Sequence, residues 1–410
     1  MEKIAITGIG IVSPSGIDKR KFWANIKAGR SAIEKITRFD ASKYPSHIAG
    51  HVHELDAYSN VSSRLLKKID LFSHMAMVAS ELAMQDANLN LAEENLKRAG
   101  IFMGNAIGGW LYGETELRDL YLEGREGVSP FLASAWFPAA PQGQISIHYG
   151  MKGYSKTVVA DRASSLMAIA YGARTLNRGK NDFILAGGME APVTPYALLC
   201  CNTSGVLTKN NEHPATAYRP YDKMRDGFAI AEGAGVIILE SPERAKKRNV
   251  PTYAHIIGYG TTTDGVDRIQ PASDGHELAN AIRIALKDAK LDPSQIDYIC
   301  LDGAATKIGD ATETLAIKQV FNSHAKKIPT SAPKSIFGNM LGASGALDVI
   351  TTVLAMEHST VPPTINLHNA DPDCDLDYCP NVAQDKEIKN ALIINRGRGG
   401  INCVLVLQKA

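Results

Sequence analysis

The stretch VVADRASSLMA, residues 158–168, follows an apolar run and begins a helical pattern, a position where enzymes often carry a nucleophile. Its turn contains Asp161 and Arg162 and has no cysteine. A guanidinium group stays protonated at ordinary pH, so Arg162 cannot act as a nucleophile. Ser164 and Ser165 follow within one turn, but the pattern shows no neighbouring histidine to activate either hydroxyl. The turn therefore predicts a cation where a nucleophile would fit.

Other residues that bind metals or cofactors do not form a complete pattern. His51 and His53 lie in GHVHEL, but no third ligand is spaced to complete a metal site. The six cysteines have no CxxC spacing, so neither a zinc site nor a disulfide framework is indicated. The GIGIVSPSG turn lacks the spacing of a dinucleotide-binding fingerprint. We expect neither a metal nor a cofactor.

The composition indicates a soluble globular protein, with 410 residues of which 45% are hydrophobic and 21% charged. Its formal net charge of +1 gives no reason to expect a nucleic acid or an anionic membrane as partner, although a local basic patch could dock an acidic carrier. No apolar run reaches the roughly 18 residues of a membrane span. MEKIAITGIG predicts a strand and a turn rather than a signal peptide. We expect a cytoplasmic protein.

Strand and helix patterns alternate along the chain, which is typical of an α/β fold with crossover helices between parallel strands. The first half predicts strands at 3–13, 99–104, 158–160 and 182–188, with helices at 62–86, after Gly108 and after the turn at 161–162. A similar order begins again in the second half, with strands at 253–265, 296–303, 391–397 and 403–410 and helices at 276–291 and from about 310. The repeat predicts a duplication with domains at 1–250 and 251–410, joined near SPERAKKRNV.

Four further segments carry a family resemblance, namely MEKIAITGIGIVSPSG, YRPYDKMRDGFAIAEGAGVIILE, PKSIFGNMLGASGALD and VPPTINL. In this order they resemble blocks of the β-ketoacyl carrier-protein synthases, and the resemblance runs from Met1 to the last strand. It implies a thiolase-type fold, in which two duplicated halves form αβαβα layers, and a dimer. Members that condense acyl chains use a cysteine nucleophile at the head of a helix and two histidines that polarise the thioester carbonyl.

All three catalytic positions of the condensing enzymes are altered in this chain. The nucleophile position falls on Arg162, the first histidine position on Asp302 in LDGAATKIGD, and the second on Asn339 in KSIFGNMLGASG. The flanking residues match without gaps at each site. Because the loss of the nucleophile alone removes covalent catalysis, the resemblance implies a chain that does not condense acyl groups.

Two other features of the family site are still recognisable. The family lysine is present as Lys334. The turn NRGRGG keeps its glycines but carries Arg396 and Arg398, where condensing enzymes commonly place phenylalanines that gate acyl entry. The gating turn is therefore altered together with the triad.

A guanidinium taken out of water needs a carboxylate beside it, since an unpaired buried charge costs several kcal/mol. The family fold would bring Asp302 next to Arg162, and Asp161 is the local alternative. We expect an Arg162–Asp302 pair, with Asn339 hydrogen-bonded nearby, to fill the former reactive site as a structural plug. The competing interpretation is a surface arginine at a helix end.

Within the family, the chain resembles the chain length factors, or ketosynthase β subunits, of type II polyketide synthases. Their helix typically reads VVAxQAGGL, with glutamine in place of the cysteine, and VVADRASSL matches it in frame. Arginine replaces that glutamine here, so any part the glutamine takes in decarboxylation does not carry over. The resemblance implies a heterodimer with a ketosynthase α subunit, and an acyl carrier protein that delivers malonyl or polyketide chains to the complex.

The segment AIGGWLYGETELRDLY, residues 106–121, corresponds to the helix that closes the polyketide tunnel at the dimer interface of chain length factors. Trp110, Gly113 and Leu117 fall at the gating positions, and their i, i+3, i+7 spacing places them on one helical face. An apolar stripe of this kind also occurs in plain interface packing.

Three hypotheses follow for the function. The leading one is a non-catalytic subunit that shapes the tunnel of an active ketosynthase. The second is a true enzyme of the condensing family that uses the residual groups, either a decarboxylase of malonyl carrier protein through Lys334 and Asn339 or an active acyltransferase like the β-ketoacyl synthases. The third is a self-associating scaffold with neither chemistry nor tunnel. The sequence leaves open the product length and whether the product is aromatic or a polyene.

Overall fold

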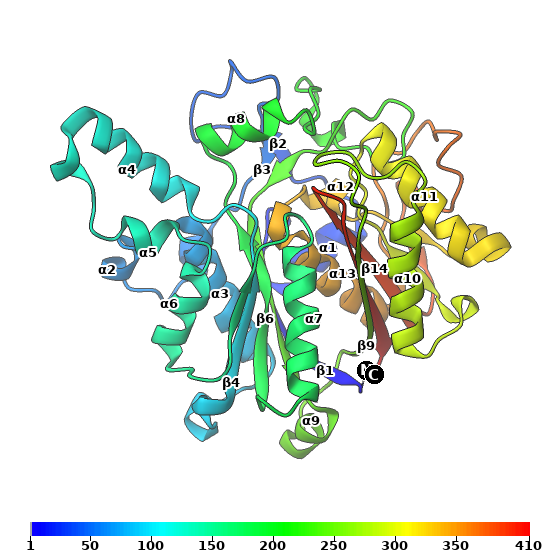
Figure 1. Cartoon of the computed structure of the whole chain (residues 1–410), viewed down its shortest axis with the longest axis horizontal. Helices are drawn as coiled ribbons and strands as arrows, with labels where there is room; N and C mark the ends of the chain where they lie inside the picture. The colour runs from blue at the N-terminus through cyan, green and yellow to red at the C-terminus, as the bar shows by residue number, and fades with distance from the viewer. Residues whose placement is uncertain (1) are drawn as a thin grey trace.

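A computed structural model describes residues 2–410 (Figure 1). Ten of its strands form one hydrogen-bonded series. At its centre, β1 (Ile4–Val12) pairs with β9 (Ala254–Thr263) only through the residues at one end of each strand. On one side of β1 follow β8 (Gly233–Glu240), β6 (Phe183–Glu190), β4 (Ala99–Gly104) and β5 (Lys156–Val158). On the other side of β9 follow β15 (Ile401–Lys409), β14 (Asn390–Gly397), β10 (Tyr298–Cys300) and β11 (Thr330–Ser331).

The two groups of five strands have the same topology. Numbered in chain order within each group, the first and fifth strands pair antiparallel, and the fifth and fourth strands also pair antiparallel. The second strand lies between the fourth and the third and is parallel to both. The internal duplication predicted from the repeating pattern is therefore confirmed. The chain crosses between the groups after α9 (Pro242–Arg248). The division into domains at residue 250 stays a prediction.

The helices form three layers around the strands. On one outer face α3 (Leu71–Asp86) packs against β1, β8 and β6, and on the other α10 (His276–Ala289) packs against β9 and β15, next to α11 (Lys307–Phe321). Between the two groups, α7 (Ser164–Asn177) and α13 (Ser344–His358) contact each other and strands of both groups (Figure 1). This is the αβαβα layering of the thiolase-type fold, so the fold prediction is confirmed.

The remaining elements lie around this layered body. Two small sheets consist of β2 (Ile33–Lys35), β3 (Ile48–Gly50) and β7 (Ile230–Ala231), and of β12 (Thr360–Val361) with β13 (Gln384–Asp385). The other helices are α1 (Lys19–Lys27), α2 (Ser63–Leu66), α4 (Trp110–Glu123), α5 (Leu132–Trp136), α6 (Ala140–Tyr149), α8 (Pro195–Thr203) and α12 (Lys334–Phe337). Figure 1 shows α4 reaching outward from the body above α5 and α6.

Glycines in the strands let the start of α7 lie directly on the sheet. A Cβ atom at Gly104 would stand 2.3 Å from the carbonyl carbon of Ser164, and one at Gly188 would stand 2.5 Å from the Cβ of Ser165. Larger residues at these two positions would push the helix away, so the AGIFMG and ILAGG strands fix where α7 begins. The turn immediately before the helix is fixed with it.

Candidate functional site

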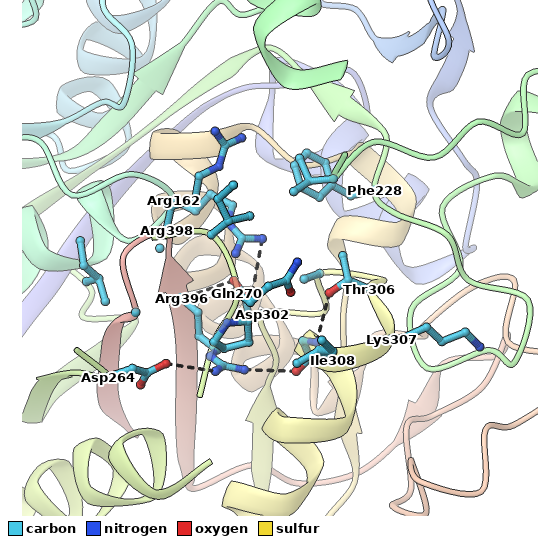
Figure 2. A pocket seen from close by; sticks show the side chains of 18 of the residues that line it. Arg162, Phe228, Asp264, Gln270, Asp302, Thr306, Lys307, Ile308, Arg396 and Arg398 are labelled. Atoms are coloured by element: carbon cyan, nitrogen blue, oxygen red, sulfur yellow. Dashed lines mark hydrogen bonds and ion pairs between the residues drawn. The ribbon is translucent and has the colours of Figure 1, made fainter. Parts of the chain in front are cut away.

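The turn before α7 opens onto a pocket of about 260 Å³ between the two halves of the chain (Figure 2). Its wall includes Arg162 from the turn, Asp302 from the loop after β10, and both Arg396 and Arg398 from the end of β14. Residues from three segments that lie far apart in the sequence therefore meet at one cavity. The pocket wall does not include Lys334 or Asn339.

The Arg162 side chain is largely buried, with 16% of its surface exposed. Its Nη1 lies 3.7 Å from Oδ2 of Asp302, its Nε lies 3.7 Å from Oδ2 of Asp161, and its guanidinium stands 5.7 Å from the ring centre of Phe228. Burial alone would lower the pKa of Arg162, and the carboxylates of Asp302 and Asp161 outweigh this, so the pKa is raised. The pocket therefore contains a permanent cation at the position where the family resemblance predicts the nucleophile.

Asp302 is held in place by a neighbouring backbone amide and by the carboxylate of Glu313. Its Oδ1 accepts a hydrogen bond of 3.1 Å from the amide of Arg396, and its own amide donates to Oε1 of Glu313 at 2.8 Å. Glu313 also accepts from the amide of Gly303 and the hydroxyl of Tyr221. Burial, together with the Asp302 carboxylate, raises the pKa of Glu313. These hydrogen bonds therefore fix the loop that carries Asp302.

The second altered position is not part of the charged pair. Oδ1 of Asn339 accepts hydrogen bonds from the amide of Leu341 at 3.0 Å and the hydroxyl of Ser344 at 3.3 Å, so the side chain caps the turn before α13. The structure thus brings Arg162 and Asp302 together, while Asn339 supports the neighbouring backbone.

Lys334 is completely buried at the start of α12. Its ammonium group donates to Oδ2 of Asp348 in α13 and to the carbonyl of Leu301 at 3.1 Å. Burial alone would lower the pKa of Lys334, but the carboxylates of Asp348 and Asp302 and other neighbouring groups together outweigh burial, so the pKa is raised. Asp348 also accepts a hydrogen bond of 2.7 Å from the side-chain Nδ2 of Asn395. Lys334 therefore joins α12 to α13 and to the loop after β10, and Asp348 extends the connection to β14.

The two arginines of the NRGRGG turn have different surroundings. Arg396 is nearly buried and donates to the carbonyl of Gly309 and the hydroxyl of Thr312, and its Nη2 lies 3.9 Å from Asp264 (Figure 2). Arg398 donates from its amide to Oδ2 of Asp161 at 2.7 Å and from Nη2 to the hydroxyl of Ser204 at 3.1 Å. Arg396 is thus anchored in the protein, whereas the Arg398 side chain has only a neutral acceptor.

The predicted gating helix begins in an aromatic cluster. The ring of Trp110 stacks obliquely on Tyr196 of α8, with centroids 4.8 Å apart, and meets Trp136 of α5 edge-on at 6.3 Å. Gly113 is buried, and a Cβ atom there would stand 3.0 Å from Cδ1 of Trp136. Leu117 is 44% exposed. Trp110 and Gly113 thus share a neighbour, and Leu117 lies further out on the helix.

The sequence alone did not identify Phe228, Glu313, Trp136 or Tyr196 as parts of these two sites. Phe228 and Glu313 lie in blocks quoted for the family resemblance or next to them, yet their neighbours come from distant segments. Trp136 and Tyr196 are aromatic residues on two other helices. Their proximity to Trp110 depends on how α4, α5 and α8 pack, which no local pattern reports.

We expect Arg162→Ala to lower the free energy of unfolding by about 3 kcal/mol, the lower end of the range for a broken buried ion pair. The loss stays near this end because Asp302 keeps its hydrogen bond from the Arg396 amide. Urea unfolding at neutral pH measures it. The matched control is Arg178→Ala, an exposed site at the far end of α7, which should cost less than about 0.5 kcal/mol.

The double variant Arg162→Ala with Asp302→Asn should recover part of that loss, since it removes the carboxylate that the single variant leaves without its cation. If Arg162→Ala lowers the free energy of unfolding by less than about 1 kcal/mol, the Arg162–Asp302 pair contributes no more than an exposed ion pair does, which contradicts the plug.

Two absences complete the description of residues 2–410. No helix in that range combines the length and apolar character that crossing a bilayer requires. In the same range, no group of three or more histidine, cysteine, aspartate or glutamate side chains is arranged to hold a metal ion.

Comparison with known proteins identifies the family. The model of the β-ketoacyl synthase N-terminal domain matches residues 1–245, and that of the C-terminal domain matches residues 253–368. The 3-oxoacyl-(acyl-carrier-protein) synthase 2 of Coxiella burnetii is 37% identical over 100% of this chain and 99% of its own length. That of Staphylococcus aureus is 37% identical over 100% of this chain and 98% of its own length.

Solved structures agree with this result over the whole chain. The ishigamide ketosynthase/chain length factor is 31% identical with a TM-score of 0.92, covering 100% of this chain and 99% of that one. The structure of a type II polyketide acyl-carrier protein in complex with its ketosynthase is 32% identical with a TM-score of 0.92, covering 100% of this chain and 99% of that one. A β-ketoacyl synthase from Burkholderia phymatum is 29% identical with a TM-score of 0.93, covering 100% of both chains. The fold, the site and these relatives together show that the chain belongs to the β-ketoacyl synthase family.

Proposed function

We propose that this chain is a non-condensing chain length factor, which pairs with an active ketosynthase and shapes the tunnel in which the polyketide grows. The observation that carries the proposal is the largely buried Arg162 at the nucleophile position, with Asp302 in place of the first histidine 3.7 Å away. A guanidinium and a carboxylate cannot perform the thiolate chemistry of condensation. In this proposal, Arg162 and Asp302 form the plug of the former reactive site.

The surface around α4 supports pairing with a second subunit. Large apolar side chains are exposed on α4, α5, α8 and the adjoining segments, at Leu117, Leu120, Tyr121, Leu122, Phe131, Trp136, Phe137, Tyr196 and Leu199. A gathering of this size marks an interaction surface more often than a bare monomer surface. The proposed partner is a cysteine-bearing ketosynthase, as in the ketosynthase/chain length factor pair among the structural relatives. An acyl carrier protein would deliver the chain to the assembled pair.

Several contacts argue against residual condensing chemistry on this chain. Ser164 and Ser165 are completely buried, and their hydroxyls are engaged with the backbone at Ala160, Asp161 and Ala346. Burial raises the pKa of five of the six thiols above its usual value, at Cys201, Cys300, Cys374, Cys379 and Cys403. Thiolates are therefore scarce at these five positions at neutral pH.

The alternative function is decarboxylation of malonyl carrier protein through Lys334 and Asn339. Neither residue lines the pocket, and the Lys334 ammonium is already engaged by Asp348. These observations favour the chain length factor over the decarboxylase. The scaffold hypothesis predicts a homodimer instead of a complex with a ketosynthase.

Co-expression with a cysteine-bearing ketosynthase tests the proposal. We expect the two chains to co-purify as a stable complex, and the complex to make a polyketide whose length is measured by mass spectrometry. A homodimer that does not bind the ketosynthase would favour the scaffold hypothesis. Decarboxylation of malonyl carrier protein by the isolated chain would favour the decarboxylase.

We also expect this chain to form no acyl-enzyme when it is mixed with acylated carrier protein. The reason is that Arg162 stands where the thiol would be, while the serines beside it are held by the backbone. Intact-protein mass spectrometry is the measurement, and a cysteine-bearing ketosynthase in the same mixture serves as the positive control. A covalent acyl adduct on any serine or cysteine of this chain would overturn the proposal.

A further inference from the structure

Two guanidinium groups at the pocket have hydrogen-bond donors left without a charged acceptor. The carboxylate oxygens nearest to Arg162 are 3.7 Å away, beyond hydrogen-bond length, and within residues 2–410 its side chain donates to no protein atom. Arg398 donates to the hydroxyl of Ser204 and lies beside the thiol of Cys201, whose pKa burial raises to about 11. Both acceptors of Arg398 are therefore neutral at ordinary pH.

The other charged groups of the pocket already have partners. Arg225 contacts Asp310 at 3.2 Å and Asp371 at 2.6 Å. Asp264 accepts hydrogen bonds from the Asn402 amide and the backbone of Ala272, and Asp226 accepts from Thr208 and the backbone of Lys209. The wall carries five cationic side chains and only three carboxylates. Lys307 lies 3.5 Å from Asp371, and Arg396 donates to Gly309 and Thr312. Arg162 and Arg398 are therefore the arginines of the wall whose guanidinium groups keep hydrogens for a ligand.

Apolar side chains form another part of the same wall, at Val206, Phe228, Ile269, Pro271, Ile308 and Ile401. The volume of about 260 Å³ lies just below the roughly 300 to 1,000 Å³ of drug-sized ligand sites. A ligand that suits this pocket is therefore small, with an apolar body and one anionic end. Planar guanidinium groups match the two oxygens of a carboxylate through paired hydrogen bonds.

We propose that this pocket binds a small organic carboxylate, whose oxygens are held by Arg162 and Arg398 and whose apolar body lies against Phe228, Ile269 and Ile308. The proposal rests on the proposed function, because a pocket no longer used for condensation is free to hold a bound ligand. The carboxylate supplies Arg162 with the close acceptors that Asp302 and Asp161 do not provide at 3.7 Å. Binding to the folded state alone also stabilises that state.

Hexanoate is the probe for this site, and hexanamide is the neutral probe of the same size. We expect hexanoate at millimolar concentrations to raise the thermal unfolding midpoint of the purified protein and to give a saturating isotherm by calorimetry, and hexanamide to do neither. Inorganic phosphate tests whether the apolar body contributes. Phosphate that binds as tightly as hexanoate would overturn the assignment to an organic carboxylate.

Arg398→Gln is the decisive variant, because the Arg398 side chain supports the fold through two neutral acceptors, the Ser204 hydroxyl and the Cys201 thiol. We expect it to weaken hexanoate binding at least about tenfold, in line with the loss of a charge-assisted hydrogen bond. Arg30→Gln, an exposed arginine outside the pocket, is the matched control and should bind like the parent protein. Arg162→Gln provides a second variant on the other side of the proposed carboxylate.

Two results would overturn the inference: no hexanoate binding by the folded protein, or equal affinity in the parent and Arg398→Gln. Failure of the proposed function is seen separately, in co-purification and product length. A complex that makes polyketide without binding hexanoate would refute only the carboxylate site. Binding of hexanoate by a chain that never pairs with a ketosynthase would refute only the chain length factor.

Discussion

Replacing Lys334 by methionine is expected to lower the free energy of unfolding by about 3 to 5 kcal/mol, the cost of leaving one partner of a buried ion pair behind. Lys334 and Asp348 are both completely buried, and the ammonium group also donates to the carbonyl of Leu301. Methionine fills a similar volume, so the loss reflects the charge rather than a cavity. Urea unfolding of the purified protein measures it.

The loss should depend on pH in a defined direction. Burial already raises the pKa of Asp348, and removing the lysine takes away the cation that opposes this rise. A carboxyl whose folded pKa lies above its unfolded value destabilises the fold when it must ionise, so the deficit is full above the folded pKa and shrinks as the pH falls through it. We therefore expect the largest loss at neutral pH and a smaller one in mild acid.

The double variant Lys334→Met with Asp348→Asn is the control. It removes both charges and keeps a side-chain carbonyl as acceptor for the amide of Asn395, so it should recover at least half of the loss. A single variant that loses less than about 1 kcal/mol, or a double variant that recovers nothing, would contradict the role of this pair in joining α12, α13 and β14.

The surroundings of Arg162 show which parts of the structure can be predicted from the sequence. Alternating patterns and the duplicated order predict the layers, because buried strands and crossover helices have distinct periodicities. The family blocks predict that Asp302 lies next to Arg162, and the structure brings them within 3.7 Å. We expected Asn339 to be hydrogen-bonded near the Arg162–Asp302 pair. Its side-chain oxygen instead accepts from Leu341 and Ser344 and caps the turn before α13.

The contacts that the sequence could not supply are those between distant surfaces. Asp161 adopts a backbone φ of 47° and accepts the amide hydrogen of Arg398, which is 237 positions away. A local pattern shows an acidic residue before an arginine and nothing of that contact. Trp110 and Gly113 likewise share one helical face in sequence, but the neighbour between them, Trp136, comes from another helix. Such contacts depend on tertiary packing rather than on periodicity.

In co-expression with a cysteine-bearing ketosynthase, Trp110→Ala is expected to shift products toward longer chains while the pair still assembles. The indole packs between Tyr196 and Trp136, so its removal opens space at the start of α4 without changing a residue of the pocket. The catalytic groups belong to the partner in the proposed function. Mass spectrometry of the products measures the shift, after size exclusion has shown an intact complex, because the truncation also costs about 3 kcal/mol or more.

Gly113→Leu should act in the opposite direction and shorten the products. A Cβ atom at this position already stands 3.0 Å from Trp136, so a leucine side chain must displace the indole or fill the space beside it. Arg118→Ala, an exposed site on the same helix, is the matched control and should leave the products unchanged. Because the two substitutions change one space in opposite directions, opposite shifts would assign that space to the tunnel. An intact complex with the same products from both variants would leave α4 as ordinary interface packing.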